Sequence, residues 1–547
     1  MGSTLRAVRA LLLLLGFYVV GLVMLGALGL ADWWLIEDGV HGIAGLKFLF
    51  LSLIVGIPIV QGMFALRGPR FEPPADGLRV DERQEPRLWA AVRRLAEQTG
   101  TRAPDEIYLV PDVNAAVYEE ARLLGLFRGR RVLLVGMPLL SGLDEAQLIS
   151  VLAHEFGHYS NADTRLGAIN RRGFEQMSRT VATLMRRSAA KVNDERVKAE
   201  EKEARRVAKG KAAREVSTGS AGLSFRLAAK PFIWYGRFYV RSMRGTMRRQ
   251  EYAADLAAAR IAGRAATASA LREVPVLDAA FGFYMKSYAS LGANAGLLPP
   301  QGEVYGGLHR LLEARSAELD ELRAGLPPEE RSAYDTHPPI ADRVARVEQF
   351  PDDGRTADAA GSALGLLDHP AAALAALEQV SLTPEALKMR RTADWEQLVH
   401  ESMTTYAGGA AQPLRQAVRE VTGGDGSFGS VLAAIEAGAL WQVADRLPKS
   451  AQAAAATGRA AREFVRPRLH DLLRDLTVAE LIARGGAHFE LSWTDSALLR
   501  LHDASEEQLA RALDAAVADV PDTAGLRQLF DLAPAGGAGS TREQEAV

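Results

Sequence analysis

The chain has 547 residues, enough for two or three domains, and its net charge is −2, from 65 basic and 67 acidic residues. This balance gives no electrostatic reason to expect a nucleic acid as partner. The chain has no cysteine, which excludes disulfides, thiolate metal ligands and a cysteine nucleophile. Any metal site must therefore consist of histidine and carboxylate side chains.

Two apolar segments near the N-terminus, residues 10–31 and 46–66, predict a pair of membrane-spanning helices. The first contains no charged residue and is long enough to cross a bilayer core of about 30 Å. The second contains Lys47 at its edge. A cleaved signal peptide ending near Ala31 is the alternative for the first segment. We favour an uncleaved anchor, because the segment is longer than a signal core and a second span follows.

The charges that flank this hairpin predict its orientation. Arg6 and Arg9 precede the first span, and Arg67 and Arg70 follow the second, whereas the loop between the spans is mainly acidic. The positive-inside rule then places both ends of the hairpin in the cytoplasm. The chain is therefore expected to be a multi-pass membrane protein with two spans, and its main body is expected to be cytoplasmic.

The next segment predicts a linker, a helix and a small sheet. Residues 70–80 contain Pro and Gly and are typical of a linker. Residues 81–100 have apolar side chains at helical spacing and predict an amphipathic helix. Short apolar runs bounded by turn residues then predict a sheet of about three strands. These runs are residues 106–110, 113–118 and 131–135.

The strongest chemical pattern is the run His154-Glu155-Phe156-Gly157-His158. Ser141 precedes Asp144 at the spacing of a helix N-cap, so we expect the run to lie on a helix that begins there. Positions i and i+4 share one helix face, so both histidines can bind one ion, and Glu155 can accept a proton from a bound water. The alternative is a surface face that is polar by chance. The helix is otherwise apolar, and burying such groups without partners is costly.

A third metal ligand is expected from the segment around Glu251. Asp255 follows it by four positions on a predicted helix, in an Ala-rich stretch that permits close packing. Glu251 would bind the metal, and Asp255 would accept a hydrogen bond from a ligand imidazole. The alternative is a pair of solvated acids. Two imidazoles and a carboxylate with an open position suit a catalytic zinc ion.

The remaining segments carry less chemistry. The charged stretch 185–216 predicts a solvated helix or loop, and the aromatic stretch 225–239 predicts a buried helix rather than a membrane-surface helix or a third span. Residues 351–365 are typical of a linker. The remainder to about residue 532 is Ala- and Leu-rich with helical spacing, and the last residues are typical of a disordered tail.

Five separated elements, in the same order, resemble the HtpX-like and CAAX prenyl protease type of zinc peptidases (metallopeptidase family forty-eight). The resemblance covers roughly residues 70 to 350 and the membrane hairpin. The elements are Asn114-Ala115, residues 151–158 with Asp163, residues 251–255, residues 336–339 with His337, and Arg343.

The resemblance implies a membrane-anchored zinc-dependent endopeptidase with one zinc ion per chain, acting on polypeptides such as misfolded or membrane proteins. The expected fold is α+β and mainly helical. It comprises a two-helix membrane anchor (1–70), a zincin-type peptidase domain with a small sheet (71–350) and a helical C-terminal region (351–547).

The roles that the resemblance implies are specific to single residues. His154, His158 and Glu251 would bind zinc, and Glu155 would be the general base. Asp163 and Asp255 would support the ligands, and His337 and Arg343 would approach the tetrahedral intermediate. Asn114 and Ala115 would belong to the edge strand that pairs with an extended substrate.

The chain also departs from this family. HtpX-like members have further hydrophobic spans between the histidines and the Glu ligand, whereas here the interval is charged. We therefore expect a largely soluble catalytic domain on a two-helix anchor. Two alternatives stay open: a membrane-anchored interaction or scaffold protein with a closed or vestigial site, and zinc hydrolysis of a non-peptide amide or ester.

Overall fold

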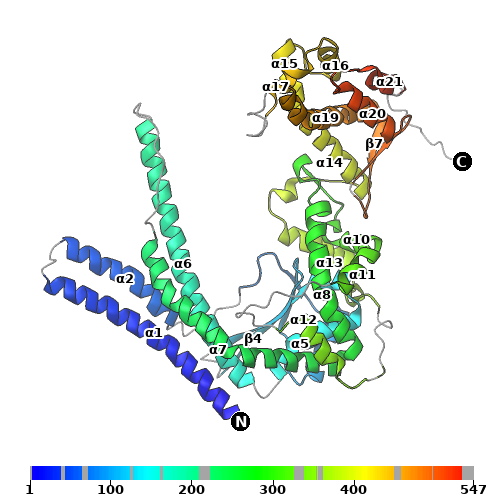
Figure 1. Cartoon of the computed structure of the whole chain (residues 1–547). Coiled ribbons are helices and arrows are strands. Elements are labelled where there is room, and N and C mark those ends of the chain that lie inside the picture. Colours follow the sequence, from blue (N-terminus) through cyan, green and yellow to red (C-terminus); the bar gives the residue numbers. More distant parts are fainter. Residues whose placement is uncertain are drawn as a thin grey trace. The chain divides into compact units, whose positions relative to one another are not determined.

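A computed structural model of the chain describes all residues except 1–2, 39–42, 64–71, 123–126, 161–163, 208–221, 326–337, 353, 355–360, 449–457, 496 and 533–547. The chain is mainly helical with small sheets, as expected (Figure 1). It divides into two compact units. Unit 1 comprises Met1–Val276 and Arg323–His369, and unit 2 comprises Leu277–Leu322 and Pro370–Val547.

The N-terminal helices α1 (Ser3–Glu37) and α2 (Ile43–Met63) form a hairpin (Figure 1). Both contain a segment long and apolar enough to cross a membrane, Leu11–Glu37 in α1 and Gly45–Met63 in α2. The two predicted spans are thus found as helices, apart from residues 64–66, which lie outside the described part of the chain.

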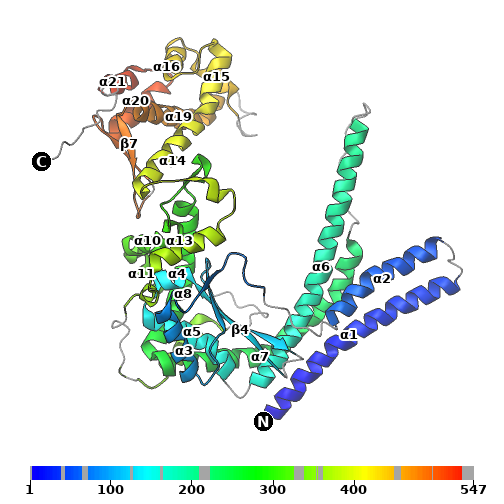
Figure 2. The same cartoon turned by 180° about the vertical axis from the view of Figure 1, so that it is seen from behind.

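The hairpin shares one apolar core with α6 (Thr164–Val207) and α7 (Leu223–Ala262), which run beside it (Figure 2). Phe17 of α1 meets Phe232 of α7, with ring centroids 5.8 Å apart. Gly62 of α2 lies against Thr180 of α6, where any larger side chain would collide. The hairpin is therefore not a separate anchor, because its inner face is covered by the two helices that follow the histidine motif.

The central sheet of unit 1 has four strands in the order β1-β2-β4-β3. The central pair β2 and β4 is parallel and the two outer pairs are antiparallel. The strands are β1 (Leu78–Val80), β2 (Glu106–Val110), β3 (Ala115–Arg122) and β4 (Phe127–Gly136). The three expected strands are present, and β3 forms one edge of the sheet.

The additional strand β1 lies in the segment that was predicted to be only a linker. It pairs antiparallel with β2, and its end is held by α3 (Pro86–Gln98), where the indole Nε1 of Trp89 donates a hydrogen bond to the carbonyl of Val80 at 3.2 Å. The predicted helix 81–100 corresponds to α3, and its apolar residues Leu88, Val92 and Leu95 are buried.

Two short helices follow β4, and their boundary differs from the expectation. Ser141 is not an N-cap, because it lies inside α4 (Met137–Gly142). The cap of α5 (Glu145–Ser160) is Asp144, whose carboxylate accepts a hydrogen bond from the backbone of Gln147 at 2.7 Å. The side chain of Gln147 in turn accepts from the backbone of Asp144 at 2.9 Å, so the pair forms a capping box.

The end of the predicted linker 351–365 is ordered and packs on α5. It follows α12 (Ile340–Glu348) and contains the short 3-10 helix η5 (Ala363–Leu366). The backbone of Glu145 donates to the carbonyl of Gly361 at 2.8 Å, and Ala363 donates to the carbonyl of Leu143 at 3.0 Å. The linker prediction is therefore wrong for these residues, because their backbone pairs with the start of the histidine helix.

Unit 2 begins within α8 (Arg264–Tyr284) and is almost entirely helical. The fully buried carboxylate of Glu378 accepts a hydrogen bond from the backbone of Val304 at 2.8 Å and pairs with Arg391 at 2.6 Å. Such contacts join residues 277–322 to the C-terminal region. The predicted domain boundary at 350 thus coincides with no edge of either unit.

The further elements are η2 (Met285–Ala289), η3 (Ala293–Ala295), β5 (Leu297–Leu298), α9 (Glu303–Gly306), α10 (Leu308–Ala314), α11 (Ser316–Ala324), α13 (Pro370–Ser381), η6 (Ala386–Lys388), β6 (Arg390–Arg391), α14 (Trp395–Ala410), α15 (Gln412–Thr422), α16 (Phe428–Glu436), α17 (Leu440–Arg446), α19 (Gly458–Ala483), β7 (Ala487–Glu490), β8 (Leu498–Leu501), α20 (Glu506–Ala516) and α21 (Ala524–Leu532). β5 pairs with β6 and β7 with β8.

Candidate metal centre

Helix α5 presents the two histidines of the motif on one side. Its opposite side is anchored in the core by Leu148, Leu152 and Phe156, which are fully buried. His154 and His158 are one turn apart, with ring centroids separated by 4.8 Å and rings nearly perpendicular. The amphipathic spacing of the helix thus holds both imidazoles at the same surface, as the sequence predicts.

Helix α7 brings Glu251 to the two histidines, although the residues are almost a hundred positions apart in the chain. The close approach depends on small residues at the crossing of α5 and α7. A side chain added at Gly157 would place its Cβ 3.2 Å from the Cα of Ala254 and 3.4 Å from the Cβ of Ala257. The expectation that the Ala-rich face permits close packing is confirmed.

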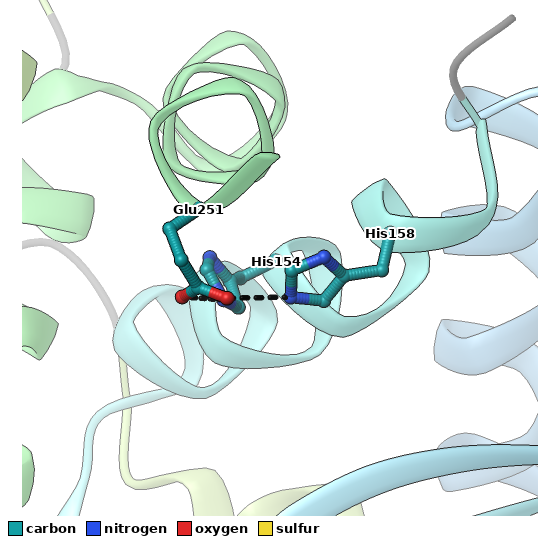
Figure 3. A group of neighbouring side chains, drawn as sticks. All are labelled: His154, His158 and Glu251. Carbon is teal, nitrogen blue, oxygen red and sulfur yellow. Dashed lines mark ion pairs between the residues drawn. The ribbon is translucent and has the colours of Figure 1, made fainter. Parts of the chain in front are cut away.

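The three side chains have the geometry of a metal-binding triad (Figure 3). One ligand atom from each of His154, His158 and Glu251 lies within 4.8 Å of the others. The two carboxylate oxygens of Glu251 lie 3.6 Å from His154 Nε2 and 3.7 Å from His158 Nε2. Ligands at zinc distances in a tetrahedral site are about 3.4 Å apart, so these residues fit one zinc ion.

Asp255 and Arg343 form an ion pair behind His154. Asp255 lies one turn after Glu251 on α7 and is fully buried, and its carboxylate lies 2.9 Å from His154 Nδ1. The guanidinium of Arg343, from α12, donates two hydrogen bonds to the same carboxylate, at 2.6 and 2.9 Å. When the Nδ1–H group of His154 donates a hydrogen bond to Asp255, the lone pair of Nε2 is available to bind a metal ion.

The electrostatics of this cluster favour a cation. Burial lowers the pKa of His154, but its hydrogen bonds to Asp255 and Glu251 outweigh burial and raise that pKa to about 9. Burial raises the pKa of Asp255, but the hydrogen bonds from Arg343 and His154 outweigh it and lower that pKa. Asp255 therefore remains a carboxylate, and the potential that retains a proton on His154 also attracts a divalent metal ion.

Arg343 approaches both His154 and the expected ligand Glu251. Its Nη2 is 3.4 Å from His154 Nδ1 and 3.9 Å from a carboxylate oxygen of Glu251. The sequence-based expectation placed Arg343 near the tetrahedral intermediate. In the structure its guanidinium is engaged with Asp255, a partner that this expectation did not include.

The edge strand β3 passes beside the end of α5. The hydroxyl of Tyr159, which follows His158, donates a hydrogen bond of 2.6 Å to the carbonyl of Val117. Ala115 begins β3, and the carbonyl of Asn114 accepts from the backbone of Gly136 on β4 at 2.7 Å. Of the two residues expected at the substrate-pairing strand, Ala115 begins a true edge strand and Asn114 directly precedes it.

The other expected site residues are placed in part. Glu155 is half-buried on α5, next to His154 in sequence. Asp163 and His337 lie outside the described residues. Two contributors were missed from sequence, namely the Gly157–Ala254 crossing and Tyr159. Gly157 follows Ala153 by four residues on α5, and Ala258 follows Ala254 by four residues on α7. Small residues at this spacing on both helices were the available signal for a close helix crossing.

Comparison with known proteins identifies the family of the central part of the chain. Residues 82–350 match the model of Peptidase family M48. These residues are a Peptidase family M48 domain. The resemblance inferred from the five sequence elements is thus confirmed, and the domain contains the triad, Asp255 and Arg343.

Individual relatives match shorter parts of the family domain. Proteins named Protease HtpX homolog, from Tropheryma whipplei strains Twist and TW08/27, are each 32% identical over 124 residues, which is 22% of this chain and 40% of the relative. The match thus spans less than half the length of these relatives. The crystal structure of S. mikatae Ste24p matches with 15% identity and a TM-score of 0.26, covering 62% of this chain and 67% of that one.

Proposed function

We propose that the chain is a membrane-anchored, zinc-dependent endopeptidase of Peptidase family M48. The observation that carries the proposal is the triad of His154, His158 and Glu251 directly beside Glu155, within a domain that matches this family. Two imidazoles and one carboxylate leave a coordination position open, which distinguishes catalytic from structural zinc sites.

The protein residues divide the chemical work. His154, His158 and Glu251 would hold a zinc ion, which would lower the pKa of a water molecule and polarise the scissile carbonyl. Glu155 accepts the proton of the attacking water and returns it to the leaving amine. Asp255 and Arg343 hold the ring of His154 in one tautomer and orientation. We assign Arg343 this positioning role rather than direct contact with the developing oxyanion.

The edge strand β3 gives a place for an extended substrate. A peptide that pairs with an exposed sheet edge gains main-chain hydrogen bonds without sequence selectivity. β3 lies next to His158 through the Tyr159–Val117 hydrogen bond, so a strand added there would pass the triad. This supports a zincin-type endopeptidase that acts within polypeptides, and misfolded or membrane proteins are the proposed substrates.

The proposed topology places the catalytic domain in the cytoplasm. The hairpin would span the membrane with both ends on the cytoplasmic side, following the positions of Arg6, Arg9, Arg67 and Arg70.

The decisive experiment compares the purified wild type with Glu155→Gln, measuring bound zinc and cleavage of an unfolded model protein. We expect both proteins to hold about one zinc per chain and only the wild type to cleave. A Glu155→Gln protein that retains zinc and full activity would refute the assigned mechanism. Absence of zinc in both would refute the ligand assignment.

The scaffold alternative needs a full-length test. A truncation at residue 350 would remove Gly361 and Ala363, which pair with the start of α5, and would leave residues 277–322 without the rest of unit 2. Full-length Glu155→Gln avoids this problem. If it restores the cellular phenotype of a null strain, the scaffold function is correct; we expect it to fail.

A further inference from the structure

The hairpin half of α7, Leu223–Met243, has an apolar face that no described residue of unit 1 covers. Leu223, Leu227, Trp234 and Phe238 follow one another at intervals of four, seven and four residues, so they share one side of the helix. They are 45%, 50%, 69% and 48% exposed, and the rings of Trp234 and Phe238 stack with centroids 6.4 Å apart. We call these four residues, two leucines followed by two aromatic residues, the aromatic stripe.

The opposite side of the same half packs on the predicted first span. The hydroxyl of Tyr235 donates a hydrogen bond of 2.6 Å to the carbonyl of Leu13, and Phe232 meets Phe17. Leu13 and Phe17 lie within the segment Leu11–Glu37 that is long and apolar enough to cross a membrane. Both residues lie in the first two turns of that segment, so Trp234, which is next to Tyr235 in the chain, is held near the N-terminal end of the first span.

The outer surface of that span is equally apolar. Leu12 and Leu15 of α1 are 61% and 58% exposed, comparable to the members of the stripe. Because α1 and α7 are in direct contact, the medium that surrounds the outer face of α1 also reaches the stripe. For a hairpin in a membrane, that medium is lipid.

The charges of the hairpin half of α7 favour contact with anionic lipids. From Leu223 to Gln250 the chain has no acidic residue, and its cations are Arg226, Lys230, Arg237, Arg241, Arg244, Arg248 and Arg249. Lys230 and Arg241 are exposed and lie three or four residues from members of the stripe, so they share its side. A helix with such a basic, aromatic face lies at the headgroup boundary and is attracted by anionic lipids.

A complete third span does not fit the same observations. Lys230 interrupts the stripe, and α7 is not among the helices long and apolar enough to cross a membrane. Long cationic side chains can reach the headgroups while their apolar stems stay buried, which suits a helix at the boundary. Trp is also the residue that best fits this boundary, because its ring is apolar and its N–H remains hydrated.

We propose that the aromatic stripe of α7 binds the surface of an anionic phospholipid bilayer, with Leu223, Leu227, Trp234 and Phe238 inserted and Lys230 and Arg241 at the phosphates. The proposal requires the hairpin to be in the membrane but does not require peptidase activity. Because α7 continues as one helix to Glu251, the lipid contact at Trp234 lies about 26 Å along the helix from a metal ligand.

The test uses the absence of cysteine in the chain. A nitroxide label is attached to single-cysteine variants of the full-length protein in nanodiscs, and its collisions with oxygen, which enters lipid, and with a neutral nickel chelate, which stays in water, are measured. Trp234→Cys reports on the stripe. Leu15→Cys is the control inside the span, and Tyr406→Cys, at a 63% exposed aromatic position of unit 2, is the control in water.

In discs that contain phosphatidylglycerol, we expect the oxygen-to-nickel ratio at position 234 to exceed that at 406 at least threefold and to approach that at 15. Equal ratios at 234 and 406 would overturn the lipid contact. Protection of position 234 from both reagents would also overturn it, in favour of a protein partner. A nickel-accessible label at position 15 would remove the premise that the hairpin is in the bilayer.

Charge dependence tests the choice of lipid. We expect the ratio at 234 to fall at least twofold in discs of phosphatidylcholine alone, and to fall similarly in anionic discs when Lys230→Gln and Arg241→Gln are added. The matched control is Lys198→Gln with Lys202→Gln, which removes the same charge from exposed positions of α6. Equal ratios in both lipids, or an equal effect of the control pair, would overturn the assignment to anionic lipid.

Discussion

The two halves of α7 pack against their neighbours with side chains of opposite size. In the metal half, Glu251–Ala262, the buried residues are Glu251, Asp255 and four alanines, and the helix approaches α5 so closely that a Cβ at Gly157 would lie 3.2 Å from the Cα of Ala254. In the hairpin half, Leu223–Met243, the buried residues include two phenylalanines and two tyrosines. Here the partner provides the space, since Gly16 of α1 accommodates the ring of Tyr235.

The difference shows what each contact must achieve. Ligand atoms on two helices must lie within a few tenths of an ångström of their positions, and small residues achieve this because they let the backbones themselves set the distance. Large rings against glycines fill space and bury area, but they tolerate small displacements. Substitutions in the metal half should therefore change the zinc affinity, and substitutions in the hairpin half should change the free energy of unfolding.

The largest expected effect is the loss of a ligand in the metal half. Glu251→Gln replaces a carboxylate that faces both histidines by an amide. We expect the bound zinc to fall below about a tenth per chain and peptidase activity to fall at least about a thousandfold. Metal analysis and cleavage assays measure both, and Glu145→Gln, an exposed acid at the start of α5, should change neither. Normal zinc content in Glu251→Gln would contradict the site.

The next effect distinguishes the two roles of Arg343. Arg343→Gln removes both hydrogen bonds to the buried Asp255. A positioning role predicts zinc affinity weakened about 10- to 100-fold, measured by competition with a chelator. We also expect the protein to lose about 3 kcal/mol of stability, because a buried carboxylate is left without its cation. Unchanged zinc affinity with a reduced kcat would instead support contact with the oxyanion.

A crowding substitution in the hairpin contact should affect stability alone. Gly62→Leu would force the new side chain into Thr180, whose Oγ1 occupies the site of a Cβ at position 62. We expect a loss of about 1–3 kcal/mol, seen as a lower melting temperature in detergent, with zinc affinity unchanged. Gly29→Leu is the matched control, since no atom lies within 4 Å of its added Cβ. A parallel loss of zinc affinity would show that the two halves are coupled.

The smallest effect comes from one methyl group at the metal-half crossing. Gly157→Ala and Gly245→Ala both replace a helical glycine, which by itself favours the helix by about 1 kcal/mol. Only Gly157 has a backbone atom of the partner helix at 3.2 Å; Gly245 has open space. We expect Gly245→Ala to stabilise the protein and Gly157→Ala to lower zinc affinity about threefold. Equal behaviour of the two variants would mean that the crossing can relax.

Local patterns were sufficient where the deciding contacts are local. The two apolar spans, the helix α3 and the strands β2 and β4 follow from runs of side chains with one periodicity. The N-cap of α5 was displaced from Ser141 to Asp144 because a short helix occupies the residues before it, and both residues are equally good caps by type. The choice between them depended on the chain direction after β4.

Contacts between distant segments account for the other differences from the sequence-based expectations. Residues 361–366 have the composition of a linker, yet their backbone pairs with the start of α5, which no property of the segment itself indicates. Residues 277–322 continue from a unit 1 helix, but their partners Glu378 and Trp395 come from the C-terminal region. Composition and periodicity describe a segment, and they do not identify the surface it will meet.

By itself the sequence determined the chemistry of the centre. An H-E-x-x-H run on an amphipathic helix places two imidazoles together whatever the surrounding fold is, because the spacing alone sets their separation. The tertiary structure decided that Arg343 pairs with Asp255 beside His154, and that the hairpin shares its core with α6 and α7. These depend on helix crossings, where backbones meet only if small residues from distant parts of the chain coincide.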